Sequence, residues 1–294
     1  MKNAITIDLE EWFHVCGVER KIPRADWHRL EHRARSATEK MLGLLGGTKG
    51  TFFVLGYVAD RDPGLIRMIA DAGHEIASHG WGHGRVTRMR PEEFRADLRR
   101  SVDSIGNACG IRPSGYRAPG WTIRRGNLWA LDVLREEGFL YDSSFLPWFP
   151  GLRPGPHRVR GLWEFPVSTR SLLGFRVPFL NGTAVRLLPG TTLTGEVRRL
   201  NATGTPAILA IHPWELDPEN PWISGWLHSR NLRATAPRVR RLIAGAEFGP
   251  ICGLLDPLLH PPLEAFEADL PDDDDSGRVG DDAPSDVLAD ARVR

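Results

Sequence analysis

Cysteine is scarce in this sequence: Cys16, Cys109 and Cys252 are the only three among 294 residues, and they lie far apart. This spacing excludes a disulfide framework and a zinc site built on CxxC pairs. We therefore expect three reduced, mostly buried thiols. A bound metal would need histidine and carboxylate ligands instead.

Long hydrophobic runs and an excess of charge of one sign are also absent. No run approaches the roughly 18 apolar residues of a membrane-spanning helix, so we predict no membrane-spanning segment. The first residues lack the basic region, apolar stretch and cleavage site of a secretory signal, which predicts a cytoplasmic protein. The net charge of +1 provides no field that would attract nucleic acid, so no nucleic-acid partner is expected.

What the sequence does contain is a regular alternation of short β-rich runs and helical patterns, with 41% hydrophobic residues to build a core. Such alternation predicts an α/β fold in which parallel βα units form a closed or nearly closed barrel. We expect strands at 4–9, 51–55, 74–78, 115–118, 139–142, 162–167 and 207–212. Helices are expected at 38–45, 63–72, 91–108, 128–137, 192–200 and 237–244.

Composition divides the chain further. We assign residues 1–217 to the barrel, with an irregular insertion at about 146–190, where proline and glycine are frequent. Residues 218–263 are expected to form a C-terminal extension packed on the barrel. The segment 264–294 is acidic and poor in large apolar residues, so we expect a disordered, solvated tail.

Polar clusters follow several of the expected strands, where the chemistry of such barrels is located. Asp8 and Glu10 come at the end of the first strand, and strand alternation places them on one face. Two such carboxylates repel each other unless a cation holds them, although a solvated acidic turn is the ordinary alternative. His79 and His83 follow the third strand, and two histidines four residues apart can converge on one metal. Gly80 and its neighbour Gly82 favour a tight loop over a helical turn.

Two further clusters complete the pattern. Arg117 ends the fourth strand and could clamp a carboxylate, or form an ordinary surface ion pair. Gly120 leaves a backbone N–H that a substrate could approach, and Trp121 beside it could stack on a ligand. His212 directly follows an apolar strand and could be a core histidine or a general acid.

Taken in order, these motifs resemble the polysaccharide deacetylase family, whose catalytic region is the NodB homology domain. The resemblance covers roughly residues 2–217 and rests on Thr6-Ile7-Asp8, the run from Ser78 to His83, Arg117-Ala118-Pro119, Tyr141-Asp142-Ser143-Ser144 and Ile211-His212-Pro213-Trp214-Glu215. The Asp-x-Glu start and the His-Pro-Trp-Glu end are similar to the deacetylases of exosortase-type, exopolysaccharide-producing systems, which carry an extra C-terminal region. The resemblance implies a distorted (β/α) barrel of seven parallel strands and a divalent metal, most often zinc.

Carried over residue by residue, the resemblance implies that Asp8 is the catalytic base and that Arg117 orients it. His79 and His83 are implied as metal ligands, and His212 as the general acid. The family's first motif usually has two adjacent aspartates, whereas Leu9 follows Asp8 here. We therefore expect Glu10 to be the third metal ligand, because it shares a face with Asp8, and Glu11 remains an alternative.

The expected reaction is removal of an N-acetyl group from a sugar in a polysaccharide or its lipid-linked precursor, in exopolysaccharide biosynthesis. We expect the Gly120 N–H to bind the oxyanion, Asp142 to keep His212 charged, and Trp121, Trp148 or Trp214 to stack on a sugar ring. The expected partner is a carbohydrate substrate, and association with the exopolysaccharide assembly machinery is a further expectation. The alternatives are a hydrolase of small cyclic amides or ureides on the same barrel, and an inactive carbohydrate-binding protein.

Overall fold

The computed structural model describes residues 1–294 apart from 17, 19–20, 147–152, 173–174, 222–225 and 261–294. The tail expected at 264–294, and residue Trp148 in the expected insertion, lie outside the described residues. Within the described part, no helix combines the length and the apolar character that crossing a membrane requires.

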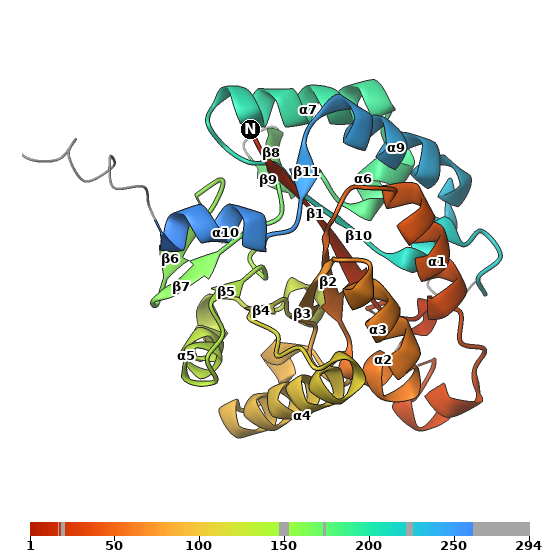
Figure 1. The fold of residues 1–294 in the computed structure, drawn as a ribbon, viewed down its shortest axis with the longest axis vertical. Coiled ribbons are helices and arrows are strands. Elements are labelled where there is room, and N and C mark those ends of the chain that lie inside the picture. Colours follow the sequence, from red (N-terminus) through yellow and green to blue (C-terminus); the bar gives the residue numbers. More distant parts are fainter. Residues whose placement is uncertain (17, 19–20, 147–152, 173–174, 222–225, 261–294) are drawn as a thin grey trace, which may run out of the picture.

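A curled, mostly parallel sheet forms the centre of the molecule (Figure 1). Its strands run in the order β10-β1-β2-β3-β4-β5-β7-β6, and β11 pairs with β1 beside this path. All neighbours from β10 to β7 are parallel, whereas β6 is antiparallel to β7. The strands of the path are β10 (Ile208–Ile211), β1 (Asn3–Leu9), β2 (Thr51–Val54), β3 (Glu75–Ser78), β4 (Gly115–Tyr116), β5 (Tyr141–Asp142), β7 (Leu162–Glu164) and β6 (His157–Val159).

The seven strands from β10 to β7 are those that the sequence predicted, and the expectation of a distorted (β/α) barrel is confirmed. The sheet does not close by a strand ladder in the described part of the chain. Instead, the segment after β7 reaches β10: the Ser168 N–H donates to the Ile208 carbonyl at 3.2 Å, and the Ile208 N–H donates to Ser168 Oγ at 2.8 Å. These two hydrogen bonds connect the two edges of the curled sheet, next to β7 and β10.

Alternate residues of the strands face two separate cores, because successive side chains point to opposite faces. Ile5 and Ile7 of β1 and Phe52 of β2 face outward against the helices. Ala4 of β1 and Phe53 of β2 face the interior. Every residue of β1 is buried, as expected for a parallel strand covered on both faces.

Helices cover the outer face, and Figure 1 shows α2, α3 and α4 side by side and α7 next to α9. They are α1 (Ala34–Leu45), α2 (Gly56–Arg61), α3 (Pro63–Asp71), α4 (Pro91–Cys109), α5 (Trp129–Glu136), α6 (Gly182–Leu187), α7 (Gly190–Ala202), α8 (Trp226–Ser229), α9 (Thr235–Gly245) and α10 (Cys252–Leu259). The six helices predicted from sequence correspond to α1, α3, α4, α5, α7 and α9. The short helices α2, α6, α8 and α10 were not predicted.

Part of the region expected to be an irregular insertion is regular. It contains β6, the antiparallel pair β8 (Thr169–Leu172) and β9 (Phe175–Pro178), and α6. These strands are short, and their side chains do not alternate between buried and exposed. The sequence therefore shows little of the two-residue period by which a strand is predicted.

The C-terminal region is built into the barrel. Strand β11 (Phe248–Gly249) pairs in parallel with the start of β1. The following turn is tied to β2, because the Ile251 N–H donates to Thr51 Oγ1 at 2.7 Å. Leu255 of α10 then packs among the interior side chains, including Phe53. Helix α10 therefore covers the barrel interior at the amino ends of the strands, opposite the polar clusters.

Candidate active site

The carboxyl ends of β1, β3 and β10 surround a pocket of about 140 Å³. Asp8, Glu10, His79, His83 and His212 all line it. The polar clusters are far apart in the chain but meet here because parallel strands present their carboxyl ends on one side of a barrel.

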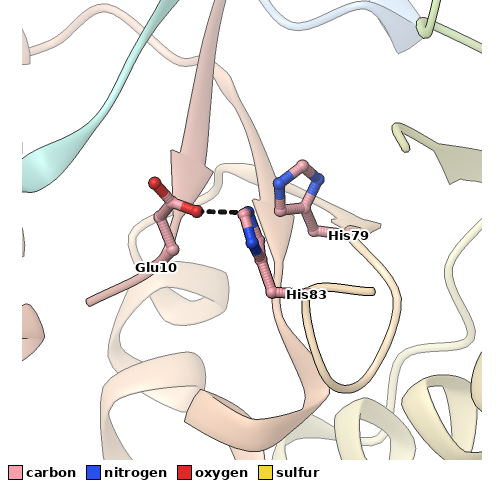
Figure 2. Close-up of side chains that lie close together, drawn as sticks. All are labelled: Glu10, His79 and His83. Atoms are coloured by element: carbon pink, nitrogen blue, oxygen red, sulfur yellow. Dashed lines mark ion pairs between the residues drawn. The ribbon is translucent and has the colours of Figure 1, made fainter. Parts of the chain in front are cut away.

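Glu10, His79 and His83 form a possible metal site at the bottom of this pocket. All three are buried, and one ligand atom from each lies within 4.8 Å of the other two. Figure 2 shows the Glu10 carboxylate and the two imidazoles turned toward one another, with His83 Nε2 2.6 Å from Glu10 Oε2. Two imidazoles and one carboxylate form the donor set of many catalytic zinc sites.

A tight loop, and not a helical turn, presents the two histidines. β3 ends at Ser78, and Gly80 (φ 74°) and His83 (φ 52°) both adopt the left-handed conformation. The carboxylate of Asp97 on α4 accepts hydrogen bonds from the backbone N–H groups of Trp81 at 2.8 Å and Gly82 at 3.2 Å. These bonds anchor the loop, so both imidazoles approach the same point.

A hydrogen bond from Nδ1 orients the ring of His79. Nδ1 lies 2.8 Å from the Arg117 carbonyl, which can only accept, so Nδ1 carries the proton and Nε2 is available as a ligand. Burial, together with neighbouring His83, lowers the pKa of His79 to about 4 despite the attraction of Asp8 and Glu10. The imidazole is therefore neutral at physiological pH, as a metal ligand must be.

The structure separates the two glutamates between which the sequence could not decide. Glu10 points to His83 and accepts from Trp214 Nε1 at 3.1 Å. The carboxylate of Glu11 instead accepts from the backbone N–H groups of Arg33 at 2.9 Å and Ala34 at 3.1 Å, at the start of α1. Glu11 thus stabilises a helix terminus, and Glu10 is the carboxylate that the fold brings to the two histidines.

Asp8 is held by a fully buried arginine. Arg117 Nη1 donates to Asp8 Oδ1 at 2.7 Å and to Thr6 Oγ1 at 2.8 Å, while Nη2 donates to Ser143 Oγ at 2.7 Å. The guanidinium also lies over the Phe53 ring, 4.1 Å from its centroid. Burial by itself would raise the pKa of Asp8, but Arg117 and the nearby histidines outweigh it and lower that pKa, so Asp8 stays ionised.

His212 lies across the pocket from this pair. Its Nε2 is 3.9 Å from Asp8 Oδ2 and 3.8 Å from Glu10 Oε1. On its other side, Nδ1 is 3.4 Å from Glu215 Oε2, which also accepts from the His212 backbone N–H at 3.0 Å. Burial disfavours the charged ring, but Glu215, Glu10 and Asp8 outweigh it and raise the pKa of His212 to about 9. The ring is thus a cationic proton donor at neutral pH.

The expectation that Asp142 keeps His212 charged is corrected by this geometry. Asp142 on β5 accepts from Ser144 Oγ at 2.6 Å and is paired with the buried Glu164 of β7. The carboxylate beside His212 is Glu215, held in turn by Arg186 Nε at 3.0 Å. The sequence analysis included Glu215 in the last motif but gave it no role, although its position three residues after His212, in a short turn opened by Pro213, was the available signal.

Gly120 and Trp121 both line the pocket, as the sequence predicted. An added Cβ at Gly120 would lie only 2.7 Å from Cys16 Sγ, so a side chain there would close part of the pocket. Trp214 stacks on His212, with 4.9 Å between ring centroids, and donates to Glu10. Trp214 therefore has a second task, which the sequence did not indicate: it fixes the orientation of a metal-site carboxylate.

Comparison with known proteins agrees with this geometry. Residues 32–135 match the polysaccharide deacetylase family and residues 149–256 match a domain of unknown function, DUF3473. The chain is 33% identical over 96 residues to a peptidoglycan deacetylase of Helicobacter pylori, covering 33% of this chain and 32% of that protein. It is 34% identical over 85 residues to a chitooligosaccharide deacetylase of a Bradyrhizobium species, covering 29% and 36%. These alignments span about a third of the length of the curated relatives.

A solved structure from Mycobacterium smegmatis, assigned to the polysaccharide deacetylases, is similar over nearly the whole chain. The TM-score is 0.62 at 26% identity, covering 86% of this chain and 88% of the other. The curled sheet with its helices is therefore a distorted barrel of the NodB type. Residues 32–135 of the chain form a region that matches the polysaccharide deacetylases, and a region that matches DUF3473 follows it.

Proposed function

We propose that this protein is a metal-dependent hydrolase that removes N-acetyl groups from an N-acetylated sugar in a polysaccharide or its lipid-linked precursor. The observation that carries the proposal is the convergence of Asp8, His212 and the Glu10-His79-His83 cluster on one pocket. An ionised carboxylate and a cationic imidazole that line one pocket, with 3.9 Å between Asp8 Oδ2 and His212 Nε2, can serve as the base and the acid that amide hydrolysis needs.

The donor set fits a divalent cation, and we propose zinc. Glu10, His79 and His83 would hold it, with two of these side chains already oriented by the Arg117 carbonyl and the Trp214 indole. Such an ion, when bound, makes water acidic enough to act as a nucleophile near neutral pH and polarises a carbonyl.

The protein's own side chains account for the proton transfers. Asp8, kept ionised by Arg117, takes a proton from the water that attacks the acetyl carbonyl. The Gly120 N–H is placed to donate to the oxyanion of the tetrahedral intermediate. When the C–N bond breaks, His212 gives its proton to the departing sugar amine, which leaves acetate and a free amino sugar. Glu215 and Arg186 hold His212 in place for this step.

The relatives support the substrate class. The similar proteins described as peptidoglycan and chitooligosaccharide deacetylases act on N-acetylated amino sugars in glycans. We propose the same class here and, more specifically, a glycan of exopolysaccharide biosynthesis, with association with its assembly machinery. The cytoplasmic location expected from the sequence stays a prediction.

Metal analysis combined with acetate release tests the proposal. The full chain, loaded with zinc, is incubated with N-acetylglucosamine oligomers and, separately, with cyclic imides. We expect acetate from the oligomers only. Ring opening of the cyclic imides without acetate release from the oligomers would favour the rival hydrolase, and bound metal and sugar with neither reaction would favour an inactive binding protein.

Two variants sharpen this test. Asp8→Asn removes the base without touching the metal ligands, so it should retain zinc and lose turnover by about 10²–10⁴-fold. His79→Ala removes a ligand, so it should lose both bound zinc and acetate release. Full activity of either variant would contradict the assignment of that residue.

A further inference from the structure

A second pocket lies beside the active site and shares one wall with it. Its volume is about 300 Å³, and His83 lines both pockets. The remaining lining combines an aromatic wall with three arginines: Phe13, His14, Trp27, Arg24, Arg85 and Arg88. The deacetylation mechanism assigns no task to any of these side chains.

Two buried N–H groups of the aromatic wall have no hydrogen-bond acceptor among the described residues. Trp27 Nε1 is one, and this side chain is only 6% exposed. His14 Nε2 is the other, in a side chain that is 2% exposed. His14 Nδ1 accepts from the Glu11 backbone N–H at 3.1 Å, so the proton of the neutral ring is on Nε2. Buried donors without an acceptor are uncommon in folded proteins, so these two N–H groups are available to an acceptor that enters the pocket, such as a water or a ligand oxygen.

The arginines add more donors and positive charge. Arg24 lies over the Trp81 ring, with 4.1 Å from Cζ to the centroid, and against the backbone of the metal loop. A Cβ at Gly82 would come within 2.5 Å of that Cζ, so the absence of a side chain at Gly82 gives Arg24 its place. Arg88 is exposed at the rim, at the end of a short 3-10 turn.

Among the described residues, the acidic group that acts on Arg24 is Asp97. Its carboxylate attracts Arg24 but accepts its hydrogen bonds from two backbone N–H groups of the metal loop. Across the described residues, no carboxylate forms an ion pair with Arg24 or Arg88 within 4.0 Å. Glu10 faces His83, on the side of the metal cluster. The pocket therefore offers hydrogen-bond donors and positive charge, and a complementary ligand supplies acceptors and negative charge.

We propose that this second pocket binds an anionic group of the glycan, a carboxylate or a phosphate, next to the sugar that is deacetylated. The proposal rests on the proposed function, because it assigns the pocket to the same substrate. The Trp27 N–H would donate to the acidic group, and Arg24 and Arg88 would pair with it. The preferred substrate is then an acidic glycan or a diphosphate-linked sugar, and not a neutral oligomer.

Steady-state kinetics of the full, zinc-loaded chain test this with three substrates. They are a neutral N-acetylglucosamine oligomer, an oligomer of equal length that contains glucuronate, and N-acetylglucosamine linked through a diphosphate to a short prenyl chain. We expect a lower KM for at least one of the acidic substrates than for the neutral one. Preference for the glucuronate oligomer identifies an acidic polymer, and preference for the diphosphate identifies a lipid-linked precursor.

Arg24→Gln and Arg88→Gln remove the charges one at a time. Each variant should increase the ratio of KM for the preferred acidic substrate to KM for the neutral substrate by about tenfold. Trp27→Phe keeps an aromatic ring but removes the N–H, and should also weaken the acidic preference. Arg240→Gln is the matched control, because Arg240 is an exposed arginine on α9, away from both pockets. Equal KM values for all three substrates in wild type, or an unchanged ratio in both arginine variants, would overturn the inference.

A binding measurement separates this inference from the proposed function. Tryptophan fluorescence is titrated with the deacetylated glucuronate oligomer and the diphosphate compound, which requires no turnover. Binding that Arg88→Gln weakens, in a protein that releases no acetate from any substrate, would support the anion site and contradict the deacetylase. Acetate release from all three substrates, with binding that the arginine variants do not weaken, would support the deacetylase and contradict the anion site.

Discussion

Glu10 and Glu11 are adjacent in the sequence and chemically identical, yet they serve different parts of the molecule. Glu10 faces His83, and Glu11 accepts two backbone N–H groups at the start of α1. Alternation along an extended strand explains this division, because successive side chains leave on opposite faces. The pair provides a matched test of the metal assignment.

We predict opposite phenotypes for Glu10→Gln and Glu11→Gln. The first changes a proposed ligand itself, so it should lower zinc affinity by more than the roughly 10–100-fold that is lost when a residue supporting a ligand is changed. It should have little effect on unfolding. The second should keep zinc and cost about 0.5–2 kcal/mol of stability, as the loss of a helix cap does. Zinc titration and urea unfolding of both variants provide the readouts. Loss of zinc from Glu11→Gln alone would reverse the assignment.

His212 gives a prediction about pH. Its pKa is raised to about 9, so the acid form persists through neutral pH and turnover should fall as the pH rises through about 9. Glu215→Gln removes the carboxylate beside Nδ1 but keeps its shape, so it should lower this pKa and move the alkaline limb of kcat to lower pH. The pH profiles of kcat for both proteins are compared. An alkaline limb that does not move would exclude Glu215 as the group that keeps His212 charged.

At the scale of elements, the contact between β5 and β7 contains a buried pair of carboxyl groups. Burial raises the pKa of Asp142 to about 6 and raises the pKa of Glu164 well above its usual range. Both groups hold protons more tightly in the folded protein than in the unfolded chain. The stability that this pair provides is therefore present in acid and is lost as the pH rises through these pKa values.

Glu164→Gln should remove most of this pH dependence. The amide oxygen can still accept from the Phe145 N–H, as Glu164 Oε1 does at 3.0 Å, and the amide nitrogen can donate to Asp142. We expect the wild-type Tm to fall between about pH 5 and pH 8 by more than that of the variant. Thermal unfolding across this range measures the difference. Parallel Tm curves would show that the pair does not control the pH response.

At the scale of the whole molecule, the active site spans two regions with different family matches. His79, His83 and Arg117 lie within the polysaccharide deacetylase match, whereas His212 and Glu215 lie within the DUF3473 match. Strands β7 and β10 also belong to the second region, and they complete the barrel. The DUF3473 region therefore contributes both structure and the proposed acid.

The C-terminal segment is integral to this assembly, which gives a further prediction. Leu255 of α10 is 2% exposed and packs inside the barrel, at the end opposite the active site. Leu255→Ala should cost about 2–5 kcal/mol of stability. It should leave kcat per folded molecule unchanged, since Leu255 does not line the pocket. Denaturant unfolding and activity normalised to bound zinc test both parts, and a stable variant with low kcat would contradict them.

Local patterns predicted the seven parallel strands, six of the helices and the strand ends that carry polar residues. These features depend on period, on glycine and proline positions and on short motifs, which neighbouring residues in the chain determine. The short strands β6, β8, β9 and β11 were missed because two to four residues without clear alternation give no period to detect. The parallel, nearly closed sheet was predicted from the alternation of strands and helices, whereas the order of its strands came from the structure.

The sequence by itself determined that the polar clusters would gather at one end of a barrel, since each follows a strand and parallel strands end together. Only the tertiary structure decided that Glu10 faces the histidines, that Glu215 replaces Asp142 beside His212, and that arginines far apart in the chain share a second pocket. Those outcomes depend on side-chain directions and on contacts between distant segments, which the curvature of the sheet sets and no local pattern encodes.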